Sequence, residues 1–450
     1  MNDKCVLVYG AGKSGIAAAN LLISHNAHVI IFDANESLDK SELMTKVSGI
    51  SKEDIILGTL SDADLKNIDL ALLSPGISVE DKYAVLIKNN GIKIIGEIEL
   101  GFYFEKGRVL AITGTNGKTT TTTLLGEIIK HAGYDTHVVG NIGNPYTLEC
   151  DLTSDESVTV LEISSFQLET IETFCPKVSA VLNITPDHLN RHHTMDNYKA
   201  AKMRIAENQS PDDHIVLNYE DEYLNEAAKD IKANVFFFSS KRELDRGIYL
   251  KDGKIIIKDK DLIELVDTNE LKIIGEHNHE NAMAAAAMAY LYGVDTDVIA
   301  SALRSFTAVE HRIEYVDTVR GVRYYNDSKG TNPDAAIKAI KAMKWPTCLI
   351  AGGYDKDSDY TEWINSFDGK VKKMVLIGQT AQKIAHTCDE CGFKDYVFAD
   401  TYDEALKICT KEAKDGDAVL LSPACASWGM FDNFEQRGDM FKSYVKSLKE

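Results

Sequence analysis

The chain has 450 residues, of which 44% are hydrophobic and 26% are charged, and this composition is that of a soluble globular protein too long for a single core. The net charge of −20 argues against a protein that holds the nucleic acid backbone, although it leaves room for a local basic pocket that binds phosphates. At this length we expect three domains. No run of 18 apolar residues and no signal-peptide pattern occurs, so we expect a cytoplasmic protein without membrane insertion. The eight cysteines are scattered and are expected to be reduced structural thiols rather than a metal or redox centre.

Alternating strand and helix patterns predict a parallel α/β domain over residues 1–97. Strands are expected at 5–9, 28–33 and 69–73, with a helix from Ser14 to about Ser24. The turn Gly10-Ala11-Gly12-Lys13-Ser14-Gly15 lies between the first strand and the helix, and Asp33 ends the next strand. This pattern is the dinucleotide fingerprint, but a UDP-sugar satisfies it as well as NAD or FAD, and a tight turn without a ligand is a third interpretation.

A phosphate-binding loop opens the second predicted domain, residues 98–304. Thr113-Gly114-Thr115-Asn116-Gly117-Lys118-Thr119-Thr120 follows the apolar run 109–112 and precedes a helix pattern. Backbone N–H groups at the glycines and the helix N-terminus can hold phosphates, Lys118 can reach the outer phosphates, and Thr119 can hold Mg²⁺. Ile112 stands where the full P-loop has glycine, so the motif is a shortened variant, and it predicts a protein that handles ATP.

Two further strand ends in this domain carry polar residues. Glu162 ends the predicted strand 158–162, where a carboxylate beside a phosphate loop can hold Mg²⁺; a surface or helix-capping acid is the alternative. His188 follows the predicted strand 178–183 in a loop with Asp187, Arg191 and two more histidines, on the rim where ligands collect in open α/β sheets. Residues 218–275 are less regular, with a short strand at 254–257, and an Ala-rich helix is expected over 281–292.

Lys202 lies on the apolar stripe of a predicted helix over 195–207. Met195, Tyr198 and Ile205 share this stripe, whereas Lys199 and Arg204 point elsewhere. A desolvated lysine loses its charge readily, and the neutral amine can react with CO₂ to give a carbamate, an oxygen ligand for a metal. A lysine that extends its ammonium from the stripe to solvent is the alternative.

The third predicted domain, residues 305–450, is a second doubly wound unit. Its strands are expected at 322–326, 348–352, 374–378, 396–399 and 418–422. Three polar loops follow strands of this sheet, Asn326 to Pro333, Gly352 to Lys356 and Leu421 to Ser427. Cations and hydroxyls gathered on one rim suit a small carboxylate ligand, although each loop alone could be ordinary turn chemistry.

Together these motifs resemble the Mur ligase family of ATP-dependent amide-forming enzymes, from Gly10 to Arg437. The resemblance rests on the short loop Gly114 to Thr120, the segment Glu162 to Leu168, His188, the Asn278/Asn281 pair and His311-Arg312. Segments 327–332, 421–427 and 434–438 are similar to the family members that add D-glutamate. The resemblance implies a bacterial cytoplasmic enzyme of peptidoglycan synthesis, a monomer of three domains: a Rossmann-like UDP-binding domain, a central P-loop-type ATPase α/β domain and a Rossmann-like amino-acid-binding domain.

The resemblance also implies a reaction and its residues. ATP phosphorylates the terminal carboxylate of UDP-N-acetylmuramoyl-L-alanine, and the amine of D-glutamate attacks the acyl phosphate. The implied catalytic residues are Lys118, Glu162, His188 and Lys202, with one Mg²⁺ on Thr119 and Glu162 and a second on His188 and carbamylated Lys202. The implied ATP contacts are Gly114, Thr115, Asn116, Gly117, Lys118, Thr119, Thr120, Asn281, Arg312, Asp327 and Lys329. The UDP-substrate contacts are Lys13, Ser14, Asp33, Ser74, Gly76, Asn141 and His188, and those of D-glutamate are Thr331, Lys356, Ser427 and Phe434.

Competing functions are an NAD-dependent oxidoreductase, a P-loop motor or helicase, a non-catalytic nucleotide-binding protein, and a relative that adds another amino acid. The oxidoreductase leaves the ATP loop unexplained. The charge of −20 argues against a nucleic-acid motor.

Overall fold

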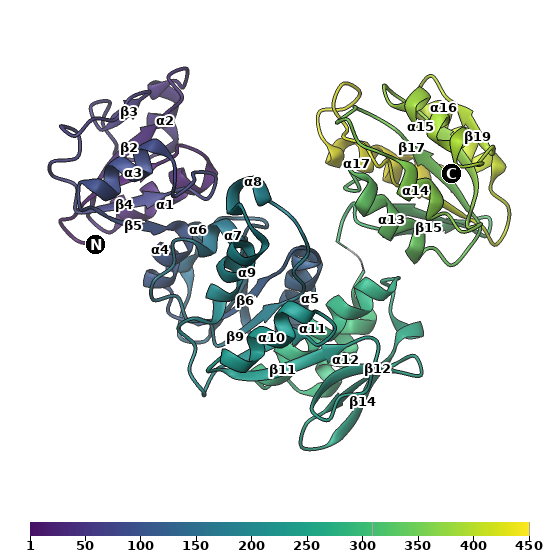
Figure 1. Cartoon of the computed structure of the whole chain (residues 1–450), viewed down its shortest axis with the longest axis horizontal. Helices are drawn as coiled ribbons and strands as arrows, with labels where there is room; N and C mark the ends of the chain where they lie inside the picture. Colours follow the sequence, from purple (N-terminus) through teal and green to yellow (C-terminus); the bar gives the residue numbers. More distant parts are fainter. Residues whose placement is uncertain (308, 450) are drawn as a thin grey trace. The chain divides into compact units, whose positions relative to one another are not determined.

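The computed structural model describes residues 1–307 and 309–449 and divides them into two compact units (Figure 1). The first unit contains Met1–Val266 and Glu280–Leu303, and the second contains Asp267–His279 and Arg304–Glu450.

The first unit begins with a five-stranded parallel sheet in the order β3-β2-β1-β4-β5. Its strands are β1 (Cys5–Tyr9), β2 (His28–Asp33), β3 (Ile55–Leu57), β4 (Leu70–Leu73) and β5 (Lys93–Gly96). The helices of this part are α1 (Lys13–Ser24), α2 (Lys40–Lys46), α3 (Lys82–Asn89) and α4 (Glu97–Phe104). The strand order reverses between β1 and β4, so the glycine turn after β1 lies at the switch point of the sheet, where ligands bind in such folds.

A nine-stranded sheet follows, in the order β14-β13-β12-β11-β10-β9-β6-β8-β7. Its strands are β6 (Arg108–Thr113), β7 (Asp135–Gly140), β8 (Ser157–Glu162), β9 (Val178–Val181), β10 (His214–Asn218), β11 (Asn234–Ser239), β12 (Gly247–Lys251), β13 (Lys254–Lys258) and β14 (Leu262–Asp267). Its α-helices are α5 (Lys118–His131), α6 (Tyr146–Glu149), α7 (Ser165–Leu168), α8 (Leu189–His192), α9 (Met195–Met203), α10 (Glu222–Ala227), α11 (Glu276–Tyr292) and α12 (Thr296–Ser305). Strands β6 to β12 pair in parallel, and β12 and β13 form an antiparallel pair. The irregular segment 218–275 therefore extends the sheet.

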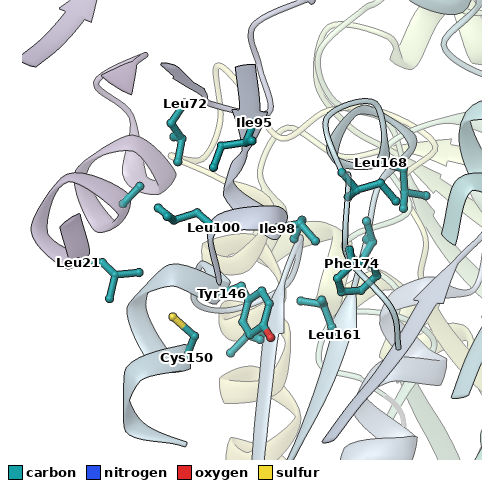
Figure 2. Close-up of a cluster of buried hydrophobic side chains, with 14 of the residues drawn as sticks. Leu21, Leu72, Ile95, Ile98, Leu100, Tyr146, Cys150, Leu161, Leu168 and Phe174 are labelled. Carbon is teal, nitrogen blue, oxygen red and sulfur yellow. The ribbon is translucent and has the colours of Figure 1, made fainter. Parts of the chain in front are cut away.

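One hydrophobic cluster joins the first two sheets. Leu21 and Leu72 from the first sheet region, Ile98 from α4, and Tyr146 and Leu161 from the second belong to the same set of buried side chains (Figure 2). Because apolar contacts continue from one sheet to the next, the two sheets pack as one unit.

The second unit contains a six-stranded sheet in the order β15-β16-β20-β17-β18-β19. The strands are β15 (Glu314–Val319), β16 (Val322–Asn326), β17 (Thr347–Ala351), β18 (Val371–Leu376), β19 (Tyr396–Phe398) and β20 (Ala418–Leu421). The helices are α13 (Pro333–Ala342), α14 (Thr361–Asn365), α15 (Ala381–Glu390), α16 (Tyr402–Glu412) and α17 (Phe434–Ser447). Edge strand β15 is antiparallel to β16, and the other pairs are parallel. Buried apolar residues form separate clusters on the two faces of this sheet. Leu349 belongs to one cluster and Val375 to the other.

The predicted α/β class is confirmed, and the errors lie at element ends. Strand β9 ends at Val181 instead of Asn183, and the next two residues bond the start of the phosphate loop: Leu182 N donates to Thr113 O (3.0 Å), and Asn183 O accepts from Thr115 N (2.9 Å). Helix α11 begins at Glu276, five residues earlier than expected, since its first turn is polar and resembles a loop in sequence. Over the described residues, no helix combines the length and apolar character that crossing a membrane requires.

Candidate active site

The phosphate loop lies between β6 and α5, as its sequence predicts. Gly114 has φ 150° and Gly117 has φ 86°, conformations that side chains rarely adopt. A Cβ at Gly114 would lie 3.0 Å from Leu182 Cβ, and one at Gly117 would lie 2.3 Å from Asn281 Oδ1. Only glycine fits at these two positions, so the loop keeps the open backbone curve that an anion requires.

Neighbouring side chains hold this loop. Asn183 Oδ1 accepts a hydrogen bond from Asn116 N (2.8 Å), and Asn183 Nδ2 donates to Asn116 O (3.1 Å). Thr115 Oγ1 accepts from Thr185 N (3.0 Å) and lies 3.2 Å from Tyr198 Oη. Asn183, Thr185 and Tyr198 were not predicted as site residues, because none belongs to a nucleotide-binding motif. The loop is thus preorganised by residues from the next strand end and from α9.

Two lysines donate to one carbonyl of the loop. Lys118 Nζ donates to Gly114 O (2.9 Å) and Thr115 O (3.0 Å), and Lys202 Nζ donates to Gly114 O (2.9 Å). Lys202 is only 1% exposed, which confirms that it points with the apolar face of its helix. Burial, followed by the positive charge of Lys118, lowers the pKa of Lys202 to about 7. A large fraction of this amine is therefore neutral near neutral pH and able to react with CO₂.

Glu162 lies buried at the end of β8 and pairs with Asn141. Asn141 Nδ2 donates to Glu162 Oε1 (2.8 Å), and Asn141 N donates to Glu162 O (2.9 Å). Glu162 is 1% exposed, and its Oε2 has no hydrogen-bond partner among the described residues. A buried carboxylate oxygen without a donor is costly, so this atom fits a hard cation such as Mg²⁺. Asn141, expected to contact the UDP-substrate, fixes this carboxylate; the substrate contact stays a prediction.

Thr119 and Thr120 occupy the first turn of α5. Thr119 is partly buried, and its carbonyl accepts from Thr123 Oγ1 (2.8 Å), whereas Thr120 is buried. Asn281 on α11 lies against Gly117, and its Oδ1 accepts from Thr121 Oγ1 (3.3 Å). Asn281 is thus placed beside the phosphate loop, and its contact with adenine stays a prediction. Across the described residues, no three histidine, cysteine or acidic side chains gather as a ready metal site.

His188 lies in an exposed turn rather than in the buried cluster around Gly114. Its side chain is half exposed, and its Nε2 lies 3.4 Å from Asp187 Oδ2. Its ring contacts Phe166, which stacks on His192, and His192 in turn contacts Tyr198 beside Lys202. An aromatic path therefore lies between His188 and Lys202, and no direct contact between the two is described.

In the first glycine turn, the carboxylate of Asp33 accepts a hydrogen bond from the turn's backbone. Asp33 Oδ2 accepts from Ala11 N (2.8 Å), and Ser74 Oγ donates to Gly10 O (3.1 Å). Lys13 Nζ donates to Gly143 O (2.7 Å), while Ser14 is partly buried and a Cβ at Gly76 would meet only open space. Asp33 and Ser74 thus shape the turn, and their contacts with UDP stay predictions.

In the second unit, Asp327 at the end of β16 is buried. Its carboxylate accepts from Ser422 Oγ (2.7 Å) and Ile313 N (3.2 Å). Burial raises the pKa of Asp327 to about 7 against the opposing effect of Arg312 and Arg437. Arg312 Nε is buried without a hydrogen-bond partner among the described residues, so a ligand atom that accepts a hydrogen bond there would satisfy it.

The residues predicted for D-glutamate lie at loops of the same sheet. Ser427 is buried after β20, Thr331 N donates to Lys329 O (2.9 Å), and Phe434 begins α17. Lys356 Nζ lies 5.0 Å from the centre of the Trp428 ring, and Lys329 Nζ lies 5.4 Å from that of Phe434. The four residues share one rim of the sheet, and their ligand stays a prediction.

Arg437 lies in the segment 434–438 that carried the resemblance, and no role of its own followed from the sequence. In the structure its side chain hydrogen-bonds the loops of this rim. It is 1% exposed, and its guanidinium donates to Ser328 O (2.7 Å), Ser328 Oγ (2.9 Å) and Cys425 O (3.3 Å). Ser328 Oγ donates to Phe434 O (2.8 Å). Hydrogen bonds of Arg437 and Ser328 therefore link the loop after β16, the loop after β20 and the start of α17.

A shortened phosphate loop with a buried lysine, followed by a separate strand-end rim, defines a nucleotide-dependent α/β enzyme of several sheets. Family models match three segments: a "Mur ligase MurD-like, N-terminal domain" over residues 4–96, a "Mur ligase middle domain" over 112–289 and a "Mur ligase, glutamate ligase domain" over 311–425. The chain belongs to the Mur ligase family.

Relatives cover the whole chain. It is 54% identical to the UDP-N-acetylmuramoylalanine–D-glutamate ligase of Lachnoclostridium phytofermentans, over 99% of both chains, and 52% identical to that of Lachnospira eligens, over all of both. Among solved structures it resembles the UDP-N-acetylmuramate-alanine ligase MurC of Thermotoga maritima (TM-score 0.60, 19% identity, 99% of both chains). It also resembles MurF of T. maritima in complex with ADP (TM-score 0.57, 16% identity, 99% and 96%). These structures show the same fold.

Proposed function

We propose that this protein is an ATP-dependent ligase that joins D-glutamate to UDP-N-acetylmuramoyl-L-alanine in peptidoglycan precursor synthesis. The observation that carries the proposal is the pair of lysines, one of them buried, on Gly114 of a shortened phosphate loop. The full-length similarity to relatives with this named activity supports the choice of substrates.

The reaction divides into two transfers. The terminal carboxylate of the UDP-substrate attacks the γ-phosphorus of ATP, an acyl phosphate forms, and ADP leaves. The D-glutamate amine then attacks the acyl carbon, loses a proton, and phosphate departs with the electrons of its C–O bond. Gly114 to Thr120 orient the transferred phosphoryl group, and Lys118 offsets its charge when its ammonium leaves the loop carbonyls.

We propose that the site binds two divalent cations, which would polarise the phosphate oxygens during transfer. Thr119 and Glu162 would hold one Mg²⁺, and the lone Glu162 Oε2 supports this assignment. His188 and carbamylated Lys202 would hold the second. Loss of the Lys202 charge on carbamylation removes repulsion with Lys118 and creates the oxygens that a hard cation prefers.

The remaining residues would bind the organic parts of the substrates. Asn281, Arg312, Asp327 and Lys329 would contact ATP, and Lys13, Ser14, Asp33, Ser74, Gly76, Asn141 and His188 the UDP-substrate. Thr331, Lys356, Ser427 and the Phe434 backbone would hold the two D-glutamate carboxylates. Lysine and hydroxyl donors suit such a diacid better than an apolar pocket does. We also propose domains 1–97, 98–304 and 305–450, a monomer, and a bacterial cytoplasmic location.

The direct test is ADP release with Mg²⁺, ATP and UDP-N-acetylmuramoyl-L-alanine against a panel of D- and L-amino acids, with mass detection of the product. We expect turnover with D-glutamate alone and a product larger by one glutamyl residue. Turnover with a different amino acid would correct the substrate. Absence of turnover together with NAD binding would overturn the ligase and favour the oxidoreductase that the first glycine turn suggested.

A further inference from the structure

Arg191, on α8, forms hydrogen bonds that the proposed reaction does not use. Its NH1 donates to Pro75 O (3.1 Å) and its NH2 donates to Ile77 O (3.0 Å) and to Glu169 Oε2 (2.6 Å). The guanidinium also lies 4.1 Å from the centre of the Phe166 ring. The side chain is 13% exposed, so these bonds are shielded from water.

These contacts join two loops that the sequence assigns to the UDP-substrate. Pro75 and Ile77 flank Gly76 in the loop after β4, and Arg191 lies on α8, three residues after His188. The amides of Arg191 and His192 both donate to His188 O, at 3.0 and 3.1 Å. A displacement of Arg191 would therefore move both the loop after β4 and the backbone of His188.

The turn that contains Arg191 is strained at both ends. His188 has φ 52° and His193 has φ 65°, in the left-handed region that residues other than glycine seldom occupy. Such conformations persist where surrounding contacts hold them. Arg191, together with the ring of Phe166 that it covers and that His188 contacts, supplies this hold.

We propose that Arg191 is a positioning residue that fixes the loop 74–77 against the His188 turn, and so presents His188 and this loop together to the UDP-substrate. The inference rests on the proposed function. A lysine cannot replace the fork, because its single ammonium cannot span two carbonyls and a carboxylate while also covering an aromatic ring.

Arg204 offers a matched control from the same unit. Its guanidinium also donates to backbone carbonyls, those of Leu168 (2.8 Å), Glu169 (2.6 Å) and Ile171 (2.7 Å), and pairs with Glu207 (2.8 Å). Among the described residues, none of its hydrogen bonds or ion pairs reaches the loop after β4 or the His188 turn, and it bonds the carbonyl of Glu169 rather than the carboxylate that holds Arg191. Arg204→Lys should therefore reveal the cost of losing a partly exposed arginine fork while the side-chain bonds of Arg191 stay in place.

The test compares Arg191→Ala, Arg191→Lys and Arg204→Lys in the full chain. Calorimetry without ATP or Mg²⁺ measures the affinity for UDP-N-acetylmuramoyl-L-alanine, and steady-state assays measure KM and kcat for each substrate. We expect Arg191→Ala to weaken binding of the UDP-substrate by about 10–100-fold, with the KM for ATP nearly unchanged. Arg191→Lys should recover little, and Arg204→Lys should bind the UDP-substrate as the wild type does.

Hydrogen exchange of the ligand-free protein gives a readout independent of activity. The amide of Ile77, which donates to Ser74 O (2.9 Å), should exchange faster in Arg191→Ala than in Arg204→Lys. In a His188→Ala background, Arg191→Ala should weaken binding less than it does alone, because both changes affect one unit. If Arg191→Ala unfolds, Glu169→Gln serves instead, since it removes the charge that holds the guanidinium.

Unchanged affinity with unchanged exchange of the loop would overturn the inference, as would equal losses in Arg191→Ala and Arg204→Lys. A wild type without ligase turnover would overturn the proposed function instead. The exchange of the Ile77 amide would still decide whether Arg191 holds the loop.

Discussion

Two glycine turns in this protein follow a buried strand and open a helix, yet their surroundings differ. In the turn after β1, Asp33 accepts from Ala11 N and Ser74 donates to Gly10 O. In the turn after β6, two lysines donate to loop carbonyls, and a neutral amide, Asn183, holds the loop. A carboxylate that accepts from a loop N–H is suited to bind sugar hydroxyls, whereas lysines are suited to offset the charge of a phosphoryl group during its transfer. The glycines thus supply the curve, and the side chains around them select the chemistry.

Replacing the lysine in each turn should separate the two roles most strongly. Lys118→Ala is expected to lower kcat by about 10²–10³-fold, because the transferred phosphoryl group would lose one of the cations proposed to offset its charge. Lys13→Ala, in the first turn, should change kcat far less and act on the KM for the UDP-substrate. Steady-state assays with each substrate varied would check this. Equal effects of the two changes on kcat would contradict the distinction between the turns.

The buried lysine beside the second turn should matter next. Lys202→Met is expected to lower turnover by about a hundredfold, since it removes the group that would hold one of the cations. Removal of dissolved CO₂ should lower wild-type turnover and leave the residual activity of Lys202→Met unchanged. Lys199→Met, on another side of the same helix, is the control. Wild-type turnover that is insensitive to CO₂ would argue against carbamylation.

Asp327 also ends a strand, and its side chain is buried, whereas that of Asp33 is only partly buried. Its folded pKa is raised from 3.8 to about 7, so between these values the folded state binds more protons than the unfolded state. Stability from this group is complete below pH 3.8 and is lost as the pH rises toward 7, at about 1.4 kcal/mol per pH unit. Asp327→Asn should remove this slope, measured by urea unfolding from pH 4 to 7. An equal slope in both proteins would show that Asp327 is ionised when folded.

Sequence patterns located the sheets and most of the proposed site, because motifs and apolar stripes are local. The phosphate loop was visible from its glycines, and the burial of Lys202 followed from its position beside Tyr198 and Ile205 on one helix stripe. Contacts between distant segments left no such signal. Asn183 was assigned to a strand, although its amide clamps the phosphate loop, and the bond between Asn141 and Glu162 spans 21 positions.

Side chains that only support a site were the hardest to foresee. Arg437 and Arg191 stand among polar residues in sequence, and only the fold buries them against loop carbonyls. The start of α11 was missed for a related reason: its first turn contains Glu276, His277 and Asn278, which are polar in sequence although Asn278 is buried in the fold.

The smallest expected effects come from the two side chains that hold the turns. Ser74→Ala removes one buried hydrogen bond, to Gly10 O, and should lower the free energy of unfolding by about 1 kcal/mol. Asn183→Ala removes two bonds to Asn116 and should cost somewhat more, about 1–3 kcal/mol. If each turn serves its own substrate, Ser74→Ala raises the KM for the UDP-substrate and Asn183→Ala raises the KM for ATP. A crossed pattern, with Ser74→Ala acting on ATP, would show that the two turns are coupled through the unit they share.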